Sequence, residues 1–572
     1  MDLILIDAIS PFFRGLARHR INWSKIPFAD LEDADGRPDA ACFARVAEDM
    51  PLVAAGIRSL GGTAATLDDL AHLAPCPHHA AELNAKIAAY QTHFAGFMEA
   101  LQRQGLSVYV TADYFSHSPG TRAACGDDPA RLASVFTDLV RAFFDRFPDA
   151  AGIILRIGET DGLDVRGDFR SELVLKRPDE VRDFLLRVLP VFEELGKTLV
   201  FRTWTVGAYP VGDLLWNPVT FDRVFSGVAS PALLVSIKHG DSDFFRHLPL
   251  NPTLLCPGVR KIVELQARRE YEGCGEYPSF TGWDVEQLRR KLEGVPGIAG
   301  ISLWVQTGGW TVFRRLAFLE NASPWTDLNA YAAVRVFRDR IPAEAALMDY
   351  CRDRLHSFAY ADLIELARLS DEVVKELLYL DDFARRPLFF RRVRVPPLFS
   401  VYWDQIFVNH SVRKLLRIFA PDGAAKVRQG QAAMRKMERM EELAKRLGLP
   451  ADDIRFMRDS LRLVALAREY YFLPFSQDRA RGLWEAKEAY QKAWPREVRY
   501  RYAVKLDFSR QRLSRHRLRS LLRLLVREQP RYRRMDRLVT LGVLSWIAPW
   551  ILRRRRDSAL SQAAMGIETI FR

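Results

Sequence analysis

Cysteine is scarce in this sequence, and its few positions show no spacing that would bind a metal or build a disulfide framework. The chain has 572 residues and six cysteines, at positions 42, 76, 125, 256, 274 and 351. So few scattered thiols exclude a disulfide-rich secreted scaffold and favour a reducing compartment. Cys76-Pro-His78-His79 resembles half of a metal site, but no second cluster completes it, so a loop is expected there. We therefore expect no metal ion and no other cofactor.

No leader peptide is expected from the first residues, and a long apolar run is also missing. The first residues, MDLILIDAISPFF, carry acids where a signal peptide has basic residues, and their apolar stretch is too short. We therefore expect a cytoplasmic protein. The apolar segment 538–552, LVTLGVLSWIAPWIL, contains Pro549 and is too short to cross a bilayer comfortably.

Negative charge is in deficit, and the positive excess is uneven. The net charge is +13, and most of the excess lies beyond about residue 380. A basic tail indicates nucleic acid, an anionic membrane or a solvated helix face, and no nucleic-acid motif is present. Two interpretations remain for segment 538–552, which is followed by RRRR at 553–556. It lies in an anionic membrane interface, making the protein peripheral to the inner face of the membrane, or it is a buried helix with basic ends.

What the first 345 residues do contain is an alternation of short β-rich runs and amphipathic helical patterns. The helical patterns include PARLASVFTDLVRAFFDRF and PDEVRDFLLRVLPVFEELG. We expect eight strands, at 15–23, 62–67, 106–113, 152–158, 198–205, 233–239, 261–266 and 300–306. Eight strands separated by helices predict a parallel sheet closed as a (β/α)8 TIM barrel over 1–345, with its active site at the C-terminal ends of the strands.

Beyond residue 345 the strand patterns stop and long helical patterns follow. We expect an α-helical domain over 346–500, packed against the barrel, and a basic, arginine-rich helical tail over 501–572. An aromatic stripe in the helical domain indicates its own core or a homodimer interface rather than a ligand-binding box. The predicted fold class is thus an α/β TIM barrel followed by an all-α C-terminal region.

Charged and aromatic side chains gather at the predicted ends of the fourth to eighth strands. They are Glu159, Asp161, Arg202, Trp204, Lys238, His239, Asp241, Asp243, Glu264, Gln266, Glu270, Tyr271, Trp304, Gln306 and Trp310. Acids, cations and tryptophans in this arrangement predict a polar cavity with aromatic walls. Such a cavity suits a sugar, whose ring faces stack on tryptophan and whose glycosidic bond is cleaved by paired carboxylates. The lack of a glycine-rich phosphate loop favours hydrolysis over phosphoryl transfer.

Each of these acids, taken alone, is explained as well by a structural salt bridge, and Gly158-Glu159-Thr160 by a helix-capping turn. Acids at three strand ends are an unusual way to stabilise a barrel, because burying each carboxylate costs desolvation free energy. The pattern as a whole therefore favours a catalytic site.

Segment 235–273, which runs from VSIKHGDSDFF to VRKIVELQARREYEG, resembles the family 67 α-glucuronidases. That family has a strand followed by Lys, Asn, Gly, Pro, any residue, Asp and Phe, and then a strand of the form Glu-x-Gln-x-x-x-Glu-Tyr. The matching residues here are Lys238, Gly240, Asp243, Phe244, Glu264, Gln266, Glu270 and Tyr271. RIGETDGLD, VFRTWT and IRSLGGTAATLDDLAHL resemble other family segments in the same order.

The resemblance implies an inverting hydrolase of α-linked uronic acids. It makes Glu159 the general acid, and Asp243 with Glu270 the pair that holds and activates the attacking water. Arg202 and Lys238 would bind the carboxylate of the sugar. Inversion needs carboxyl groups about 6.5–9.5 Å apart across the sugar, and Glu159 needs a raised pKa to remain a proton donor.

The sequence departs from the family pattern around the predicted pocket floor. His239 and Asp241 replace the usual Asn and Pro, and Thr160-Asp161-Gly162 replaces Gly-Gln-Pro. These differences leave the substrate more open than the chemistry. The other predicted substrate-binding residues are Asp161, Trp204, His239, Trp304 and Trp310.

The leading hypothesis is a hydrolase that removes an α-linked uronic acid, such as glucuronic acid, from an acidic oligo- or polysaccharide. The alternatives are a glycosidase for a different or neutral sugar, a barrel that binds acidic polysaccharide without cleaving it, and a membrane-surface scaffold that works through its tail. A binding protein needs no general acid, so the three strand-end acids favour the enzyme.

Overall fold

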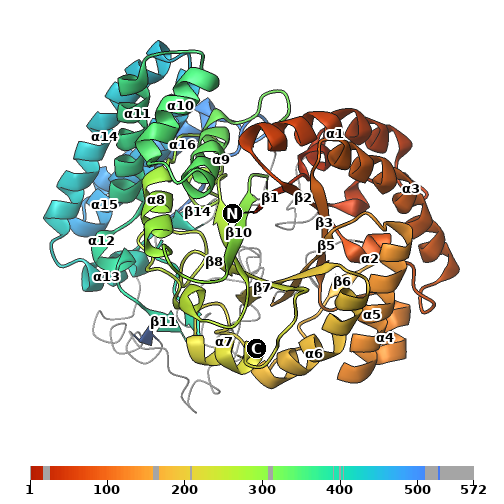
Figure 1. Ribbon diagram of the computed structural model, residues 1–572. Coiled ribbons are helices and arrows are strands. Elements are labelled where there is room, and N and C mark those ends of the chain that lie inside the picture. Colours follow the sequence, from red (N-terminus) through yellow and green to blue (C-terminus); the bar gives the residue numbers. More distant parts are fainter. Residues whose placement is uncertain are drawn as a thin grey trace.

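The computed structural model describes residues 2–16, 26–158, 167–205, 209–306, 314–390, 392–398, 401–402, 405–508 and 526–527 (Figure 1). Its N-terminal part is a closed barrel of eight strands that run parallel and neighbour one another in chain order. The strands are β1 (Leu3–Asp7), β2 (Ala64–Leu67), β3 (Ser107–Asp113), β5 (Gly152–Gly158), β7 (Thr198–Thr205), β8 (Leu233–Lys238), β9 (Lys261–Gln266) and β10 (Ile298–Trp304). The predicted TIM barrel is confirmed.

The first strand was expected in the wrong place. β1 is formed by Leu3–Asp7, whereas the prediction placed a strand at 15–23, of which 17–23 lie outside the described residues. A barrel strand is buried on both faces and therefore reads as a short, continuous apolar run. LILID fits this pattern, and GLARHRINW, with three basic residues in its centre, does not.

An apolar layer fills the barrel near the N-terminal ends of the strands. It takes one buried side chain from each of seven strands, namely Leu5, Ala64, Tyr109, Ile154, Val200, Leu234 and Ile262. Side chains alternate along a strand, so residues two and four positions further on also face the interior. This rule turns Arg202 and Trp204 of β7, Lys238 of β8 and Glu264 of β9 into the barrel. The alternation that builds the apolar layer therefore directs polar side chains toward the C-terminal ends.

Helices alternate with the strands and cover the outside of the barrel (Figure 1). They are α1 (Ala40–Leu60), α2 (Leu70–Leu73), α3 (Ala81–Arg103), α4 (Pro119–Cys125), α5 (Pro129–Arg146), α6 (Pro178–Glu194), α7 (Pro218–Phe225), α8 (Gly282–Lys291) and α9 (Pro324–Arg338), with 3-10 turns η1 (Ser10–Phe13), η2 (Phe28–Asp30) and η3 (Pro252–Leu255). Side-chain caps fix several starts: the Asp128 carboxylate accepts hydrogen bonds from the first backbone N–H groups of α5. Both quoted amphipathic patterns form helices, α5 and α6.

The C-terminal region is mainly helical, as predicted, and lies at one side of the barrel (Figure 1). Its helices are α10 (Ala343–Asp353), α11 (Tyr360–Val373) with a π-helical continuation η4 (Val374–Leu378), α12 (Asp381–Ala384), α13 (His410–Phe419), α14 (Gly423–Arg446), α15 (Ala451–Phe472) and α16 (Gln477–Ala493). Among the described helices, none is both long and apolar enough to cross a membrane.

Short strands also occur among the helices beyond residue 345, where the sequence showed no strand pattern. They are β11 (Phe389–Phe390), β12 (Val393–Arg394), β13 (Val401–Tyr402), β14 (Gln405–Asn409), β15 (Ala503–Asp507) and β16 (Val526–Arg527), and the barrel loops add β4 (Ser116–His117) with β6 (Arg170–Ser171). β14 pairs with β15 across nearly a hundred residues, which leaves no local sequence pattern. β15 lies in the predicted helical tail; segments 538–552 and 553–556 lie outside the described residues.

Hydrogen bonds to buried carboxylates join the helical region to the barrel. Glu272 lies in the loop after β9 and accepts a hydrogen bond from Nε of Arg246 at 3.1 Å. It accepts another, at 2.7 Å, from the hydroxyl of Tyr379, which follows α11 and η4 in the helical region. Asp453, in the first turn of α15, accepts one from the indole N–H of Trp325 on α9 at 2.8 Å. Both carboxylates are completely buried. The helical region is thus fastened to the same loops that surround the strand ends.

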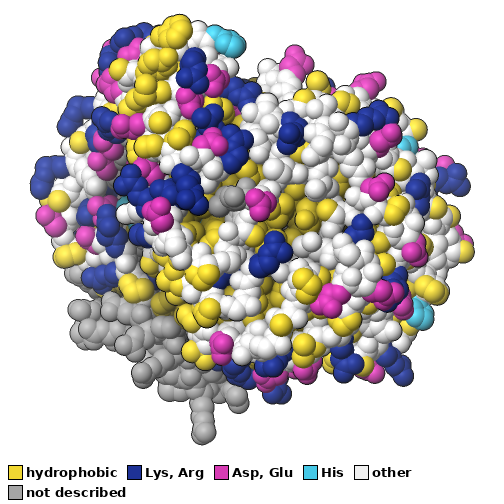
Figure 2. All heavy atoms as spheres, in the orientation of Figure 1, with side chains coloured by type: hydrophobic (Ala, Val, Ile, Leu, Met, Phe, Trp, Pro, Cys, Tyr) yellow, Lys and Arg dark blue, Asp and Glu magenta, His cyan; other side chains and the backbone are white. Residues whose placement is uncertain are grey.

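The outer surface of the helical region carries both signs of charge. Figure 2 shows Lys and Arg side chains there with Asp and Glu among them. Lys436 pairs with Glu372 and Glu376 at 2.8 Å, and Arg439 with Glu365 at 2.9 Å. In the described part of the region, much of the basic charge therefore belongs to a solvated, salt-bridged helix face.

Candidate functional site

A bidentate ion pair lies inside the barrel between β7 and β9. Nε and Nη2 of Arg202 donate to the two carboxylate oxygens of Glu264 at 3.0 and 2.6 Å. Ser236, on the strand between them, donates to the same carboxylate at 3.0 Å. Burial on its own raises the pKa of Glu264, but the charge and hydrogen bonds of Arg202 and the charge of Lys238 lower it to about 2. Glu264 is therefore a negatively charged partner of Arg202.

A second cation–carboxylate pair lies beside the first, at the end of β8. Nζ of Lys238 contacts Oδ1 of Asp243 at 2.5 Å, and the Tyr271 hydroxyl donates to Oδ2 at 2.6 Å. The backbone N–H of Phe244 donates to Oδ1 at 3.0 Å. All of these side chains are buried. Three donors therefore fix the position of the Asp243 carboxylate.

Tryptophans stack on both cations. Nζ of Lys238 lies 3.4 Å from the centre of the Trp204 ring, and Cζ of Arg202 lies 5.0 Å from that of Trp304. Both distances are in the range of cation–π attraction. The predicted combination of cations, acids and tryptophans is thus present at the ends of β7, β8, β9 and β10.

Glu270 is held in the loop that follows β9. Its backbone N–H donates to the side-chain oxygen of Gln266 at 2.9 Å, and its side chain is 3% exposed. The preceding Arg269 has φ of +58°, a left-handed conformation that turns the chain there. The following Tyr271 reaches Asp243, so this loop and the loop after β8 are joined at the two predicted catalytic residues.

His239 and Asp241 follow β8 in the same segment as Asp243. Burial, with the charge of Arg269, lowers the pKa of His239 to about 4, so its imidazole is neutral at pH 7. Its ring lies nearly parallel to that of Phe244, with centroids 6.1 Å apart. Burial raises the pKa of Asp241, and its nearest cation is Arg394 of β12, at 3.7 Å.

Three predicted site residues lie outside the described residues: Glu159, Asp161 and Trp310. Glu159 follows the last residue of β5 in the chain. The predicted role of Glu159 as general acid, and the predicted substrate contacts of Asp161 and Trp310, stay predictions.

A further ion pair at the strand ends was missed. Nε and Nη2 of Arg156 on β5 donate to the two oxygens of Asp113 on β3 at 2.7 and 2.9 Å, and the Ser171 hydroxyl donates to Asp113 at 2.9 Å. The signal was available, because Asp113 is the last residue of a predicted strand and Arg156 lies inside another. The pairing of Arg156 with Asp113 could not be predicted, because the sequence does not show the register between neighbouring strands.

Two more strand-end carboxylates have structural roles. Asp7, at the end of β1, accepts hydrogen bonds from the backbone N–H groups of Val305 at 2.5 Å and Gln306 at 2.9 Å. Asp68, just after β2, accepts one from the Thr111 hydroxyl at 2.6 Å. Asp7 was not predicted as a strand-end residue, because the first strand was predicted at 15–23. Among the described residues, no group of three or more His, Cys, Asp and Glu is arranged to hold a metal ion.

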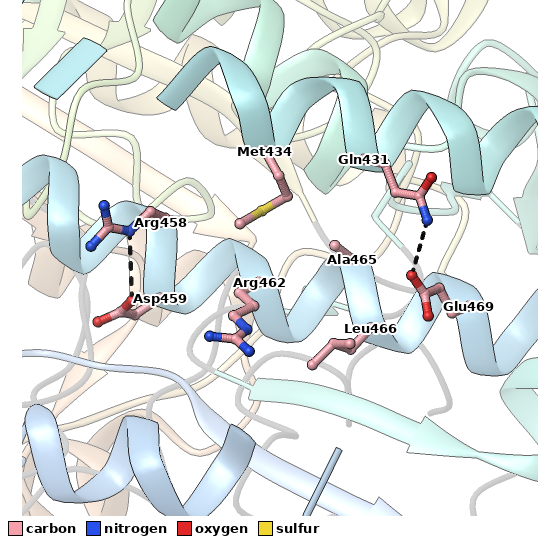
Figure 3. A pocket seen from close by; sticks show the side chains of 8 residues that line it. All are labelled: Gln431, Met434, Arg458, Asp459, Arg462, Ala465, Leu466 and Glu469. Atoms are coloured by element: carbon pink, nitrogen blue, oxygen red, sulfur yellow. Dashed lines mark hydrogen bonds and ion pairs between the residues drawn. The ribbon is translucent and has the colours of Figure 1, made fainter. Parts of the chain in front are cut away.

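A surface cavity of about 350 Å³ lies between α14 and α15, away from these residues (Figure 3). Its lining is Gln431, Met434, Arg458, Asp459, Arg462, Ala465, Leu466 and Glu469. Gln431 bonds Glu469 across it at 3.2 Å. All of these lining residues belong to α14 and α15, and none of the described barrel residues is among them.

No protein-family model matches the chain, and no curated protein matches it in sequence. Among solved structures, it is similar to a GH138 enzyme targeting pectin rhamnogalacturonan II, with a TM-score of 0.50 and 10% identity, over 87% of this chain and 62% of that one. The chain thus spans less than two thirds of that enzyme. At this identity the likeness supports the fold alone.

Weaker likenesses exist to a GH5-4 broad-specificity endoglucanase from Bacteroides salanitronis and to a D-allulose 3-epimerase from Methylomonas sp. The first has a TM-score of 0.32 and 10% identity, over 50% of this chain and 84% of that one. The second has a TM-score of 0.34 and 12% identity, over 59% and 98%. The resemblance to family 67 α-glucuronidases has no support from a family match.

Proposed function

We propose that this protein is a glycoside hydrolase that removes an α-linked uronic acid, glucuronic acid-like, from an acidic oligo- or polysaccharide. The observation that carries the proposal is the pair of buried acids, Asp243 and Glu270, presented by loops after adjacent barrel strands and joined through Tyr271. Buried carboxylates beside cations and tryptophans are suited to cleaving a sugar that stacks on the aromatic rings.

In the proposed reaction, a water oxygen attacks the anomeric carbon and the water proton passes to the Asp243–Glu270 pair. The bond from the anomeric carbon to the leaving oxygen breaks, and Glu159 protonates that oxygen. A single displacement inverts the configuration. Arg202 and Lys238 attract the carboxylate of the substrate. That carboxylate competes with Glu264 for Arg202 and with Asp243 for Lys238.

The substrate class is proposed from the sequence resemblance, and the GH138 enzyme with a similar fold, which targets pectin rhamnogalacturonan II, suggests only that acidic polysaccharides are the substrates to test. The segment 235–273 resembles the family 67 α-glucuronidases in the residues Lys238, Asp243, Glu264 and Glu270.

A hydrolase of a neutral sugar is the second candidate. In its favour, both cations expected to bind a substrate carboxylate already hold protein carboxylates, Arg202 that of Glu264 and Lys238 that of Asp243. A substrate with hydroxyls alone would leave these pairs intact.

Thermal unfolding with added sugars separates the two candidates, because a ligand that binds only the folded protein raises its Tm. We expect glucuronate or galacturonate at high concentration to raise Tm, glucose to have no effect, and Arg202→Ala to reduce the response measured from its own ligand-free Tm. Stabilisation by glucose alone would favour the neutral-sugar hydrolase. No response to any of the three sugars would contradict a sugar site.

The cellular setting is proposed separately. A cytoplasmic location, contact of the tail with an anionic membrane, a homodimer formed through the helical region and the absence of nucleic-acid binding stay predictions from the sequence.

A further inference from the structure

A short hairpin of the C-terminal region packs against the barrel loops. It consists of β11 and β12, and Figure 1 shows β11 near α7. The Phe389 ring lies 4.9 Å from that of Trp216, in a cluster that also includes the half-buried Trp204. The indole N–H of Trp216 donates to the carbonyl oxygen of Arg392 at 3.0 Å, and Nη1 of Arg392 pairs with Asp213 at 2.7 Å. The hairpin thus extends the aromatic wall that begins at Trp204.

Arg394, the last residue of this hairpin, is buried with unused hydrogen-bonding capacity. It is 3% exposed, and within the described part of the chain its Nε and Nη1 have no hydrogen-bond partner. The nearest carboxylate oxygen is Oδ1 of Asp241, 3.7 Å from Nε, and this oxygen also lacks a hydrogen-bond partner among the described residues. By contrast, Arg202 uses Nε and Nη2 on Glu264 at 3.0 Å or less.

An enclosed guanidinium with open donors is energetically costly, because desolvation is not compensated by hydrogen bonds. Barrel-facing arginines of this protein, Arg156 and Arg202, avoid that cost through bidentate carboxylates. Arg394 and Asp241 together offer an unfilled donor and an unfilled acceptor. A hydroxylated carboxylate, such as a sugar acid, supplies the matching groups, and guanidinium is the side chain best suited to a carboxylate.

The position of the pair links it to the candidate site. Asp241 lies two residues before Asp243, and Cζ of Arg394 lies 5.5 Å from the centre of the Phe389 ring. We propose that Arg394 and Asp241 form a second subsite, which binds the carboxylate and a hydroxyl of the acidic sugar unit adjoining the one that is cleaved. This subsite rests on the proposed function, and it makes the C-terminal hairpin part of the substrate-binding surface.

The test compares binding of galacturonate with binding of the disaccharide of two galacturonate units, by calorimetric titration. Wild-type protein is expected to bind the disaccharide at least about tenfold more tightly than the monosaccharide, since a charge-assisted contact is added. In Arg394→Met, which keeps the side-chain volume, this gain is expected to disappear while monosaccharide binding changes less than about twofold. Asp241→Asn is expected to reduce the gain in part.

Arg392→Met is the matched control, because it removes a cation of the same hairpin that pairs with Asp213. It is expected to keep the disaccharide gain. If Arg394→Met does not fold, Arg394→Lys keeps the charge without the guanidinium plane and is expected to lose most of the gain.

The outcomes separate the two claims. A disaccharide gain that survives in Arg394→Met, or that Arg392→Met loses equally, overturns the subsite and leaves the proposed function standing. If the wild type binds the monosaccharide but binds the disaccharide no more tightly, the subsite is likewise overturned and the proposed function stands. A wild type that binds neither uronate overturns both.

Discussion

Arg202 and Glu264 form a buried pair, and removing one member leaves the other charge uncompensated inside the barrel. Glu264→Ala is therefore expected to lower the free energy of unfolding by about 3–5 kcal/mol. Glu194→Ala is the control, because it breaks a pair of the same type with Arg141, at 2.6 Å, on the exposed surface. The control is expected to have little effect. Urea denaturation at pH 7 measures both, and equal losses would contradict the account of the buried pair.

The same pair makes stability depend on pH in acid. The pKa of Glu264 falls from an ordinary value of 4.5 to about 2 on folding. A carboxyl whose pKa is depressed contributes stability that is present above the unfolded pKa and is lost as the pH falls toward the folded one. The unfolding free energy is expected to decrease from pH 4.5 toward pH 2, by roughly 3 kcal/mol from this group.

Glu264→Gln isolates this contribution, because it keeps the shape of the side chain and removes the titration. Urea midpoints measured at pH 5 and pH 3 are expected to differ less in Glu264→Gln than in the wild type. A wild-type difference that the variant reproduces in full would show that other carboxylates account for it.

At the scale of elements, helix starts are specified by side-chain caps. The Asp128 carboxylate accepts hydrogen bonds from the N–H groups of Ala130 and Arg131 at the start of α5. Asp128→Ala is expected to lower the free energy of unfolding by about 1 kcal/mol. Asp127→Ala, one residue earlier and with a side chain that is 88% exposed, removes the same charge without a cap. Chemical denaturation is expected to show little change for Asp127→Ala.

The barrel elements were readable from the sequence because each strand is a short apolar run and each helix an amphipathic stretch. β2 to β10 of the barrel were predicted within a few residues, and β1 was missed because its run stands at the start of the chain. The C-terminal strands β11 to β16 were not predicted. β11 and β14 each pair with a strand about a hundred residues or more away, β16 and β15, and the other strands have only two residues, too few to show a pattern.

At the scale of the whole molecule, the sequence predicted which residues lie at the strand ends but not the contacts between them. Arg202, Lys238, Asp243 and Glu270 were predicted as site residues because each lies near or just after the C-terminal end of a recognised strand. That Arg202 faces Glu264, and that Lys238 holds Asp243, follows from register and loop conformation, which the sequence does not display. The contribution of the C-terminal hairpin needed the tertiary structure, since Arg394 lies more than a hundred residues beyond Asp241.

In the proposed reaction, the paired acids of the barrel hydrolyse a uronic acid glycoside with inversion. The most direct measurement is proton NMR of the products when the protein is incubated with an aryl α-glucuronide and with acidic oligosaccharides. We expect the β-anomer of the free uronic acid to be released first, and Glu270→Gln and Asp243→Asn each to slow its release by at least about a hundredfold. Release of the α-anomer, or release that both variants leave unchanged, would contradict the account.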